Sequence, residues 1–294
     1  MLKRGTVRAR AGKKITPAVA VATVLLLVCA PATAADLIVR RGDGSINWTR
    51  SFISATGRSE ATVAPEGAAI DPEDGRTLSI NGARSDTYRR AREASLENLL
   101  RAMRTIRIDP DRRLSDFLKE DDSVRRRLSE RLAEETRFRR YPAGFMASEC
   151  EARLSFGGII GSLSWDFPAI ELPVIDDSPL KTDYTGLIVD GRGLGLEPML
   201  FPSIYDGDGV EIYGRTFIDS RFALKHGLAS YCHTEDEARA LGRAGDRPYY
   251  SVALKSMNAC PVISERDARR VLAAQTTRNS LKRCRVVIIL DRNG

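Results

Sequence analysis

At residues 184–198 the chain reads YTGLIVDGRGLGLEP. A short apolar strand, Leu187 to Val189, runs into Asp190, and glycines alternate at positions 191, 193 and 195. Alternating glycines directly after a strand indicate either left-handed backbone or a close approach of the backbone to another group. We therefore expect this strand and turn to organise the C-terminal part of the fold.

The first 34 residues have the pattern of a secretory signal peptide. Six basic residues and no acidic residue occur there, an apolar run follows from about Ile15 to Ala30, and Pro31-Ala-Thr-Ala34 offers a small-x-small cleavage pattern. The alternative is a membrane anchor, but the run is shorter than the ~20 residues that span a bilayer. Cys29 does not follow small residues, so we do not expect lipidation. The sequence predicts a periplasmic protein with no membrane span after cleavage.

The charge balance changes when this leader is removed. It holds six of the 46 basic residues, so the remainder has 40 basic against 39 acidic residues and a net charge near +1. A nucleic-acid-binding domain typically carries a basic surplus on its folded part. The sequence therefore predicts no nucleic-acid partner.

Four cysteines lie outside the leader, at Cys150, Cys232, Cys260 and Cys284. An even number in an exported chain permits disulfides, although the sequence does not choose between the three pairings. Free buried thiols are the alternative. Zinc is not expected, because no Cys-x-x-Cys occurs and the spacings are long.

The pattern of apolar residues indicates an α+β fold with mixed, short-stranded sheets and a few packed helices. Residues 36–67 read as strands, and a helix is expected to begin near Ser85 or Asp86, because an apolar stripe runs from Leu96 to Ile106. A second helix is expected over 123–138. The period then changes to two over 149–165, which predicts a strand, and further short strands are expected through Phe167 and Ile175.

A linker-like segment, Asp176 to Pro179, suggests a domain boundary. We therefore divide the chain into the signal peptide (1–34), an N-terminal α+β domain (35–178) and a C-terminal α+β domain (179–294). In the second domain, residues 206–209 read as a hairpin turn and Ser264 as a helix cap. The strand near Tyr249, the helix after Ser264 and a strand over 285–290 suit a βαβ crossover.

The residues give no convincing catalytic, cofactor or metal site. The glycines after Asp190 are not followed by the helix that a phosphate-binding loop needs, and Gly-Lys-Ser/Thr is absent. Residues 206–211 lack the ligands of a calcium loop. The two histidines, His226 and His233, are weak evidence for a metal, and no Gly-x-Ser-x-Gly occurs. We therefore expect a protein that is not an enzyme.

Two segments resemble known families. The run from Tyr184 to Pro198, followed by Tyr205 to Gly214, is similar to uncharacterised Gram-negative envelope proteins with a YTGLIVDxRGLGLxP motif. The tail over 260–290 is similar to them as well. The segment Ala91 to Ser95 more distantly resembles the Ala-Arg-x-x-Ala helix of the flagellar assembly protein FlgT and related basal-body lipoproteins. The resemblance implies an exported, non-catalytic protein whose partners are envelope or flagellar basal-body proteins.

These observations lead to three hypotheses. The first is a periplasmic structural or interaction protein that supports an envelope machine, with the flagellar base as one candidate. The second is a periplasmic small-molecule or glycan-binding protein, and the third is a hydrolase whose site is not recognisable in the sequence. The motif residues that we select as a candidate interaction site are Tyr184, Gly186, Asp190, Arg192, Gly193, Gly195, Pro198 and Tyr213.

Overall fold

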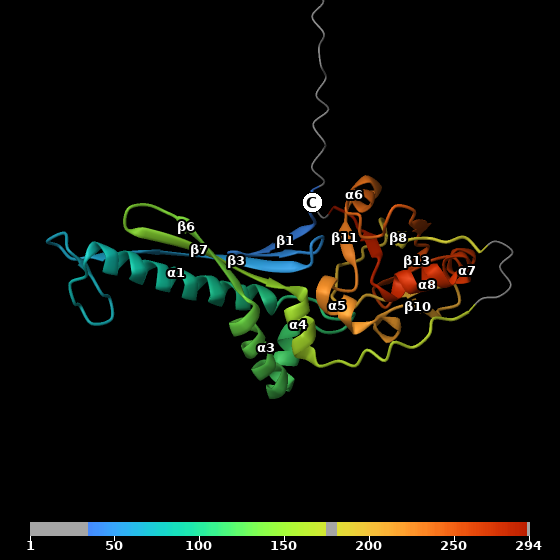
Figure 1. Cartoon of the computed structure of the whole chain (residues 1–294), viewed down its shortest axis with the longest axis horizontal. Coiled ribbons are helices and arrows are strands. Elements are labelled where there is room, and N and C mark those ends of the chain that lie inside the picture. Colours follow the sequence, from blue (N-terminus) through green and yellow to red (C-terminus); the bar gives the residue numbers. More distant parts are fainter. Residues whose placement is uncertain (1–34, 175–180, 293–294) are drawn as a thin grey trace, which may run out of the picture. The chain divides into compact units, whose positions relative to one another are not determined.

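The computed structural model describes residues 35–174 and 181–292, and these residues belong to one compact unit. The predicted signal peptide, Cys29 and the predicted boundary after Ser178 lie outside the described residues. The α+β prediction is confirmed, because helices pack on several short-stranded sheets (Figure 1). Within the described ranges, no helix combines the length and the apolar character needed to cross a bilayer.

The N-terminal half is built on a five-stranded antiparallel sheet. Its strands, in spatial order, are β1 (Ile38–Arg41), β2 (Gly44–Asn47), β3 (Phe52–Glu60), β7 (Ala147–Ser155) and β6 (Arg137–Pro142). Burial alternates along β3 and β7, since one face of the sheet is covered and the other is solvated. A separate ribbon is formed by β4 (Thr62–Val63) and β5 (Ala69–Ile70).

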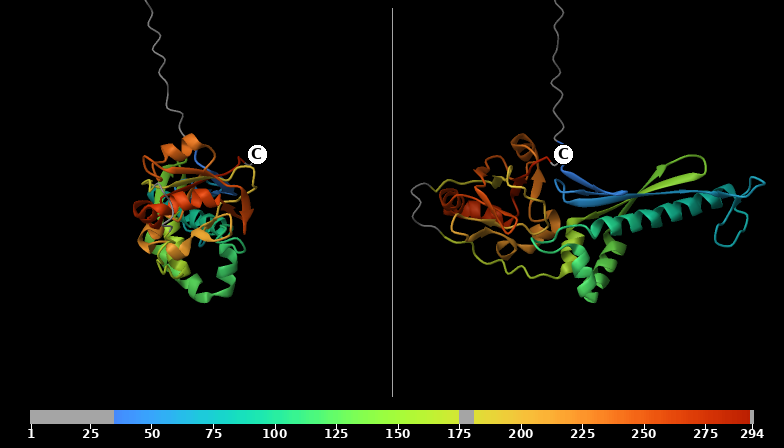
Figure 2. Two further views of the ribbon diagram at one scale, coloured as in Figure 1. Left: turned by 90° about the vertical axis from the view of Figure 1, so that its right-hand side faces the viewer. Right: turned by 180° about the vertical axis from the view of Figure 1, so that it is seen from behind.

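The covered face lies under α1 (Ile80–Met103), which runs along the sheet in both side views (Figures 1 and 2). The helix is capped six residues before the expected Ser85, because the Ser79 hydroxyl accepts a hydrogen bond from the Gly82 amide at 3.1 Å. Asp86, the other predicted cap, instead pairs with Arg89 and Arg90. The predicted helix start was therefore wrong.

Small residues let α1 approach the sheet closely. Ala91 and Ser95 face Gly57 of β3, and a Cβ atom built on Gly57 would lie 2.3 Å from the Ala91 carbonyl oxygen and 2.2 Å from the Ser95 amide nitrogen. No real Cβ atom sits so close to backbone atoms. Glycine at position 57 is thus required by the distance between helix and strand.

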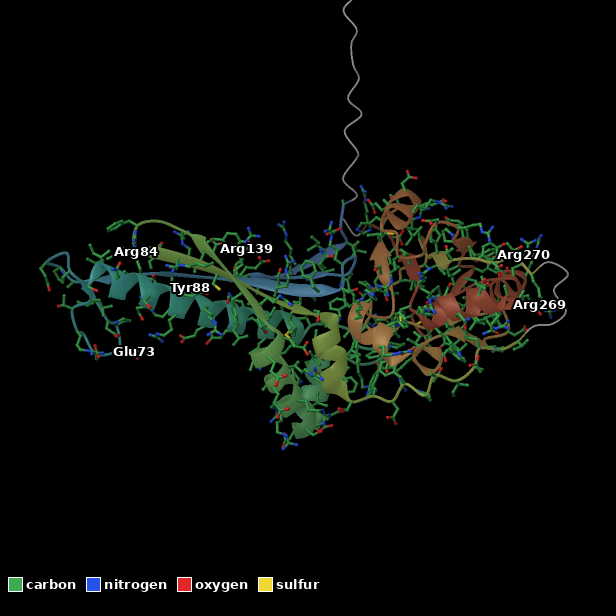
Figure 3. All side chains as sticks on the ribbon, in the orientation of Figure 1. Glu73, Arg84, Tyr88, Arg139, Arg269 and Arg270 are labelled. Carbon is green, nitrogen blue, oxygen red and sulfur yellow. The ribbon has the colours of Figure 1, made fainter. Side chains whose placement is uncertain are left out.

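Arginine–aromatic contacts join the open edge of the sheet to α1. The Arg92 guanidinium lies over the Phe138 ring at 4.2 Å, and the Arg140 guanidinium lies over the Tyr88 ring at 4.8 Å. Figure 3 labels Tyr88 on α1 and Arg139 on the neighbouring strand β6. Each such pair contributes about 0.5–1 kcal/mol at an exposed site. The contacts therefore hold the edge strand against the helix while its charges stay in water.

Three helices lie in the N-terminal half, and the last of them packs against α5 (Ser220–His226). They are α2 (Leu114–Glu120), α3 (Asp122–Glu135) and α4 (Phe156–Leu163). The expected strand over 149–165 is correct only to Ser155, since α4 follows directly. A Cβ atom on Gly157 would lie 1.9 Å from the Leu224 carbonyl oxygen, so glycine is required at this position, where α4 packs against α5. Residues 164–174 contain no strand, contrary to the prediction, and Ile175 lies outside the described residues.

The C-terminal half contains a parallel sheet. Its strands, in spatial order, are β11 (Ser230–Cys232), β15 (Val286–Ile289), β8 (Leu187–Asp190) and β12 (Tyr249–Val252). The motif strand β8 is central and buried at every position. The expected parallel crossover between β12 and β15 is present, with β8 between them. Helices α5 (Ser220–His226), α6 (Glu235–Ala240), α7 (Glu265–Ala273) and α8 (Gln275–Lys282) accompany this sheet.

A second, mixed sheet lies beside it. Its order is β10 (Glu211–Tyr213), β9 (Ile204–Tyr205), β14 (Cys260–Val262) and β13 (Lys255–Met257). The hairpin turn predicted at 206–209 is confirmed, because the Gly209 amide donates to the Asp206 carbonyl at 3.0 Å. A short 3-10 helix, η1 (Arg215–Phe217), follows β10.

One buried apolar cluster includes residues from both predicted domains. Trp48, next to β2, contacts the rings of Phe156 and Tyr231 edge-on, with centroids 5.0 and 5.7 Å away. The Thr49 hydroxyl accepts from the Leu37 amide at 2.7 Å and donates to the Tyr231 carbonyl at 2.6 Å. The turn after β2 is therefore fixed to strand β11.

We expect Gly57→Ala to destabilise the protein by about 3 kcal/mol, since the new methyl group must push α1 away from β3. Urea unfolding followed by circular dichroism measures this change. The control is Gly161→Ala in α4, where the nearest atoms to a built Cβ belong to the flexible Arg131 side chain at 3.5 Å. Equal stability of the two variants would contradict the close helix–strand contact.

Candidate functional site

The motif residues lie in several places, at both edges of the parallel sheet and beyond it. At the carboxyl edge, the Asp190 carboxylate accepts from the Arg192 amide (3.1 Å), Nε (2.9 Å) and Nη2 (2.5 Å), and from the Tyr250 hydroxyl (2.6 Å). The hydrogen bonds from Arg192 are the main reason that the pKa of Asp190 is lowered to about 2, with burial opposing them and Tyr250 adding to them. All four bonds to this carboxylate come from the protein itself.

The glycine turn after β8 is also satisfied internally. The Gly193 amide donates to both carboxylate oxygens of Asp291, at 3.0 and 2.9 Å. Gly193 and Gly195 have φ values of 79° and 63°, in the left-handed region that favours glycine. A Cβ atom on Gly191 would lie 2.7 Å from Leu196 Cδ1. The glycines thus shape the backbone.

The remaining motif residues lie elsewhere. Tyr184 and Gly186 precede β8 at the amino edge, where the Tyr184 ring contacts that of Tyr249 at 4.9 Å. Pro198 is partly buried in the loop before β9. Tyr213 is fully buried, and its hydroxyl donates to the Leu228 carbonyl at 2.5 Å. The structure therefore does not bring the eight predicted residues into one site.

All four cysteines within the described residues are free and buried. The structure therefore has the free buried thiols that were the alternative to disulfides. Each has different neighbours: the Cys232 thiol contacts the Thr234 carbonyl, and the Cys260 thiol contacts the Met199 sulfur. Burial raises the pKa of Cys232 and Cys284 to about 12 and also raises the pKa of Cys150 and Cys260. These groups are inert thiols at neutral pH.

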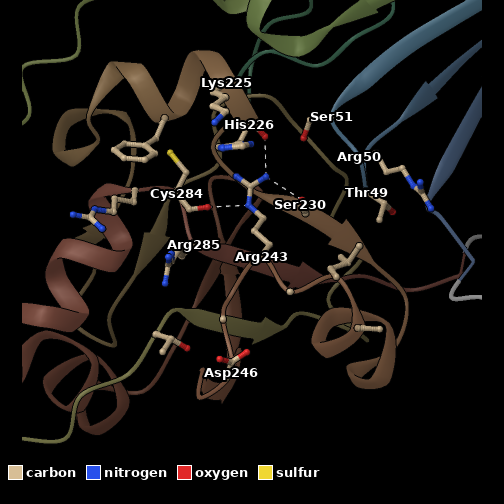
Figure 4. Close-up of a pocket in the computed structure, with 17 residues that line it drawn as sticks. Thr49, Arg50, Ser51, Lys225, His226, Ser230, Arg243, Asp246, Cys284 and Arg285 are labelled. Carbon is tan, nitrogen blue, oxygen red and sulfur yellow. Dashed lines mark hydrogen bonds between the residues drawn. The ribbon is translucent and has the colours of Figure 1, made fainter.

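Sequence reasoning missed a pocket of about 920 Å³ at the amino edge of the parallel sheet. Its wall comes from the turn after β2, the residue Thr185 before β8, α5 with the start of β11, the end of α6 with the loop that follows, and the loop between α8 and β15. Figure 4 labels ten of its residues. They are Thr49, Arg50, Ser51, Lys225, His226, Ser230, Arg243, Asp246, Cys284 and Arg285.

Arg243 is at the centre of this pocket, and its guanidinium is bonded mainly to main-chain oxygens. Nε donates to the Cys284 carbonyl (2.8 Å), Nη1 to the His226 carbonyl (2.8 Å) and the Ser230 hydroxyl (3.0 Å), and Nη2 to the Gly227 carbonyl (2.7 Å). Two of these carbonyls belong to the end of α5, where a cation is favoured. No carboxylate of the described residues pairs with Arg243, so its charge is not cancelled by an opposite ion.

Other cations surround Arg243. Arg50 pairs with Asp36 at 2.7 Å, whereas the part of the chain that the structure describes offers no ion pair to Lys225 or Arg285. Asp246 is the sole carboxylate among the described lining residues. The site thus has a surplus of positive charge, although the net charge of the chain without its leader is near zero.

The two histidines do not meet. His226 lines the pocket, and its pKa is lowered by burial and by the charges of Arg243 and Lys225. His233 lies at the carboxyl edge, with Nδ1 3.3 Å from the Leu290 carbonyl oxygen. The residues that the structure describes contain no cluster of three or more side chains able to hold a metal.

One sequence signal could have pointed to the pocket. Basic residues lie at or just after the ends of three short helices: Lys225 and His226 end α5, Arg243 follows α6, and Arg283 and Arg285 follow α8. A helix end binds such residues through its free carbonyls, so each of them alone reads as a cap. Their convergence depends on the order of the strands, which the sequence does not reveal.

The parallel sheet and its helices define an α/β module. Residues 186–292, from just before β8 to just after β15, match a family model described as the second domain of Treponema pallidum Tp0624. No curated protein matches the chain. The similarity thus concerns the module that contains most of the pocket, while the turn after β2 lies outside the matched range.

We expect Asp190→Asn to lower the free energy of unfolding at pH 7 by about 2 kcal/mol. The pKa of Asp190 is about 2 in the folded state and 3.8 for a free aspartate, so the ionised carboxylate stabilises the fold. The contribution is complete above about pH 5 and is lost as the pH falls from about 4 towards 2. Urea unfolding at pH 7 and pH 3 measures it. An equal loss of unfolding free energy at both pH values would contradict the stabilising role of the ionised Asp190 carboxylate.

Proposed function

We propose that the chain is a non-catalytic binding protein of the cell envelope whose C-terminal module holds an anionic ligand. The observation that carries this proposal is the uncompensated charge of the pocket at the amino edge of the parallel sheet. Arg243, Lys225 and Arg285 have no carboxylate partner among the described residues, and they line one cavity of about 920 Å³. Placement in the envelope rests on the leader pattern of residues 1–34.

The physical basis is the cost of holding like charges together. Lys225 and Arg285 are exposed and Arg243 is partly buried, and like charges that line one cavity repel each other when no counterion is present. An anion in the cavity removes the repulsion and gains hydrogen bonds from guanidinium groups, which suit carboxylate and phosphate oxygens. The pKa of His226 is lowered mainly by burial, and the charges of Arg243 and Lys225 lower it further.

We expect the purified protein to bind inorganic phosphate or citrate with an affinity that falls as salt rises, because salt screens these charges. The double variant Lys225→Gln/Arg285→Gln should bind at least about tenfold more weakly, since it removes two cations from the cavity. Isothermal titration calorimetry measures both effects. The matched control is Arg266→Gln, which removes an exposed arginine of α7 outside the pocket.

Proton uptake provides a further readout in the same titrations. The charged groups around His226 are Lys225, Arg243, Arg50, Arg283, Arg285 and Asp246. A bound anion offsets the cations and raises the pKa of His226 from its lowered value, so the protonation of His226 should strengthen binding as the pH falls below the ordinary histidine value of about 6.5. Tight binding of neutral ligands only, or of no ligand at all, would refute the anion-binding proposal.

A second candidate is a structural or interaction protein of an envelope machine such as the flagellar base. It is supported by the outer edge of β6, which among the described strands pairs with β7 alone and carries Arg139 and Tyr141 on its solvated face. An open edge strand can accept a strand from a partner. The arginines on it restrain uncontrolled pairing, as charges on edge strands commonly do.

Complementation of a gene deletion separates the two candidates. If partner binding is the function, the deletion impairs motility or envelope integrity, and Arg139→Glu/Tyr141→Ala fails to restore it while Lys225→Gln/Arg285→Gln restores it. If ligand binding is the function, the opposite pattern is expected. Normal motility and envelope integrity in the deletion strain would count against the interaction role.

A further inference from the structure

The hydrogen bonds between β7 and β3 show in which direction the main-chain groups of each β7 residue point. At one end of β7, the Met146 carbonyl accepts from the Ala61 amide at 2.8 Å. At the other end, the Phe156 amide donates to the Ser51 carbonyl at 2.9 Å. The register between these two points is continuous, and residues of an antiparallel strand bond alternately to the neighbour on either side. The even-numbered residues of β7 therefore bond to β3, and the odd-numbered residues bond to β6.

The register of β6 and β7 then shows which residues of β6 have outward main-chain groups. The odd-numbered residues of β7 are opposite Arg137, Arg139 and Tyr141, whose amide and carbonyl groups thus face β7. The residues between them, Phe138 and Arg140, direct their amide and carbonyl groups away from β7. No group of the described residues bonds to these outward groups. An open edge of this kind can accept an extended chain.

This edge is also rich in arginine. Three arginines lie on β6 itself and two lie on the part of α1 beside it: Arg137, Arg139, Arg140, Arg84 and Arg92. Within the part of the chain that the structure describes, none of the five forms an ion pair with a carboxylate. Their charge is therefore available to a partner.

The carboxylates next to β6 do not cancel this charge. Glu151 is opposite Arg139 in the register, but it accepts from the Tyr141 hydroxyl at 3.1 Å and pairs with Arg153 at 3.3 Å. Glu149 is the other carboxylate of β7. The carboxylates on this stretch of α1 pair with other arginines of the helix. The edge thus keeps a surplus of positive charge.

Aromatic rings hold several of these guanidinium groups in place. Arg139 lies over the Tyr141 ring at 5.0 Å and Arg84 over the Phe145 ring at 5.4 Å, in addition to the two contacts with α1 described above. Figure 3 labels Arg84 and Arg139 in this part of the molecule. A ring covers the flat face of a guanidinium and leaves the N–H groups at its rim accessible, and these suit carboxylate oxygens. The edge thus presents donors whose positions are already restrained.

We infer that the outer edge of β6 binds an extended polypeptide segment rich in aspartate and glutamate. The segment adds to the sheet as a further strand: its main chain pairs with Phe138 and Arg140, and its carboxylates meet the guanidinium groups. A polypeptide is favoured over other polyanions, because it supplies amide and carbonyl groups at the spacing of a strand. Pro142, the next outward position, has no amide hydrogen, so the added strand is short. This inference rests on the second candidate function and names the chemistry of its partner.

Fluorescence anisotropy with three labelled heptapeptides tests the partner chemistry on the purified protein. The acidic peptide is Glu-Val-Glu-Val-Glu-Val-Glu, and the other two have threonine or lysine in place of glutamate. Alternation places all glutamates on one face of the added strand, beside Arg137 and Arg139. The acidic peptide should bind about tenfold more tightly than the threonine peptide, with a difference that shrinks as salt rises, and the lysine peptide should bind least.

Two further measurements test strand addition itself. The acidic peptide should slow amide hydrogen exchange over residues 137–141, measured by mass spectrometry, because the outward amides become bonded. The same peptide with every backbone amide methylated keeps its charges and cannot pair as a strand. It should bind at least about tenfold more weakly and leave the exchange of β6 unchanged.

Two pairs of variants assign the binding to this edge. Arg139→Glu should weaken the acidic peptide about tenfold, whereas Arg126→Glu makes the same charge change at an exposed position of α3 and should have little effect. Arg140→Pro removes an outward amide hydrogen and retains the bonds between β6 and β7. It should bind the acidic peptide several-fold more weakly than Arg140→Ala, with circular dichroism confirming that both variants are folded.

The outcomes separate this inference from the proposed functions. If the methylated peptide or a single-stranded oligothymidylate binds as tightly as the acidic peptide, the edge attracts polyanions by charge alone and the inference is overturned. If the threonine peptide binds equally tightly and slows exchange in β6, the acidic partner is wrong and the edge-strand role stands. If no peptide slows exchange in β6, the inference and the edge-strand role both fall, while anion binding in the pocket depends on other residues.

Discussion

The guanidinium group of Arg243 is the interaction on which the pocket depends. It joins the end of α5, the loop before β15 and the first residue of β11 through hydrogen bonds of 2.7–3.0 Å. The end of α5 and β11 follow each other in sequence, whereas Cys284 is distant and reaches them because the parallel sheet places β11 and β15 side by side. A lysine could not reach the same set of oxygens, because its donors diverge from a single nitrogen. The same cation fixes the scaffold and sets the electrostatic field of the cavity.

Local sequence patterns predicted much of the framework. The strand that ends in Asp190 and the glycine turn after it were correct in position and in physical reason, since Gly193 and Gly195 adopt positive φ values. Period-four apolar residues also located α3, with Val124 and Leu128 buried. Such patterns are reliable where neighbours in sequence determine the backbone.

Other features depend on contacts that no local pattern reveals. The start of α1 at Ile80 follows from the Ser79 cap, although Ser85 offered the same chemistry. The pocket was missed for a related reason: Thr49, Lys225, Arg243 and Arg285 are spread along the sequence and form no motif. Their convergence is a property of strand order, which leaves no trace in composition or spacing. The motif residues are the opposite case: most of them are close together in the sequence, yet the structure does not bring them into one site.

The four separate thiols have a consequence for how the fold can be followed in solution. Cys150 lies under α1, Cys232 in the parallel sheet, Cys260 in the mixed sheet and Cys284 in the pocket wall. A buried thiol exchanges with reagents only when its surroundings open. Each cysteine therefore reports the opening of the part of the structure that surrounds it. The order in which the four thiols are modified would show which part opens first.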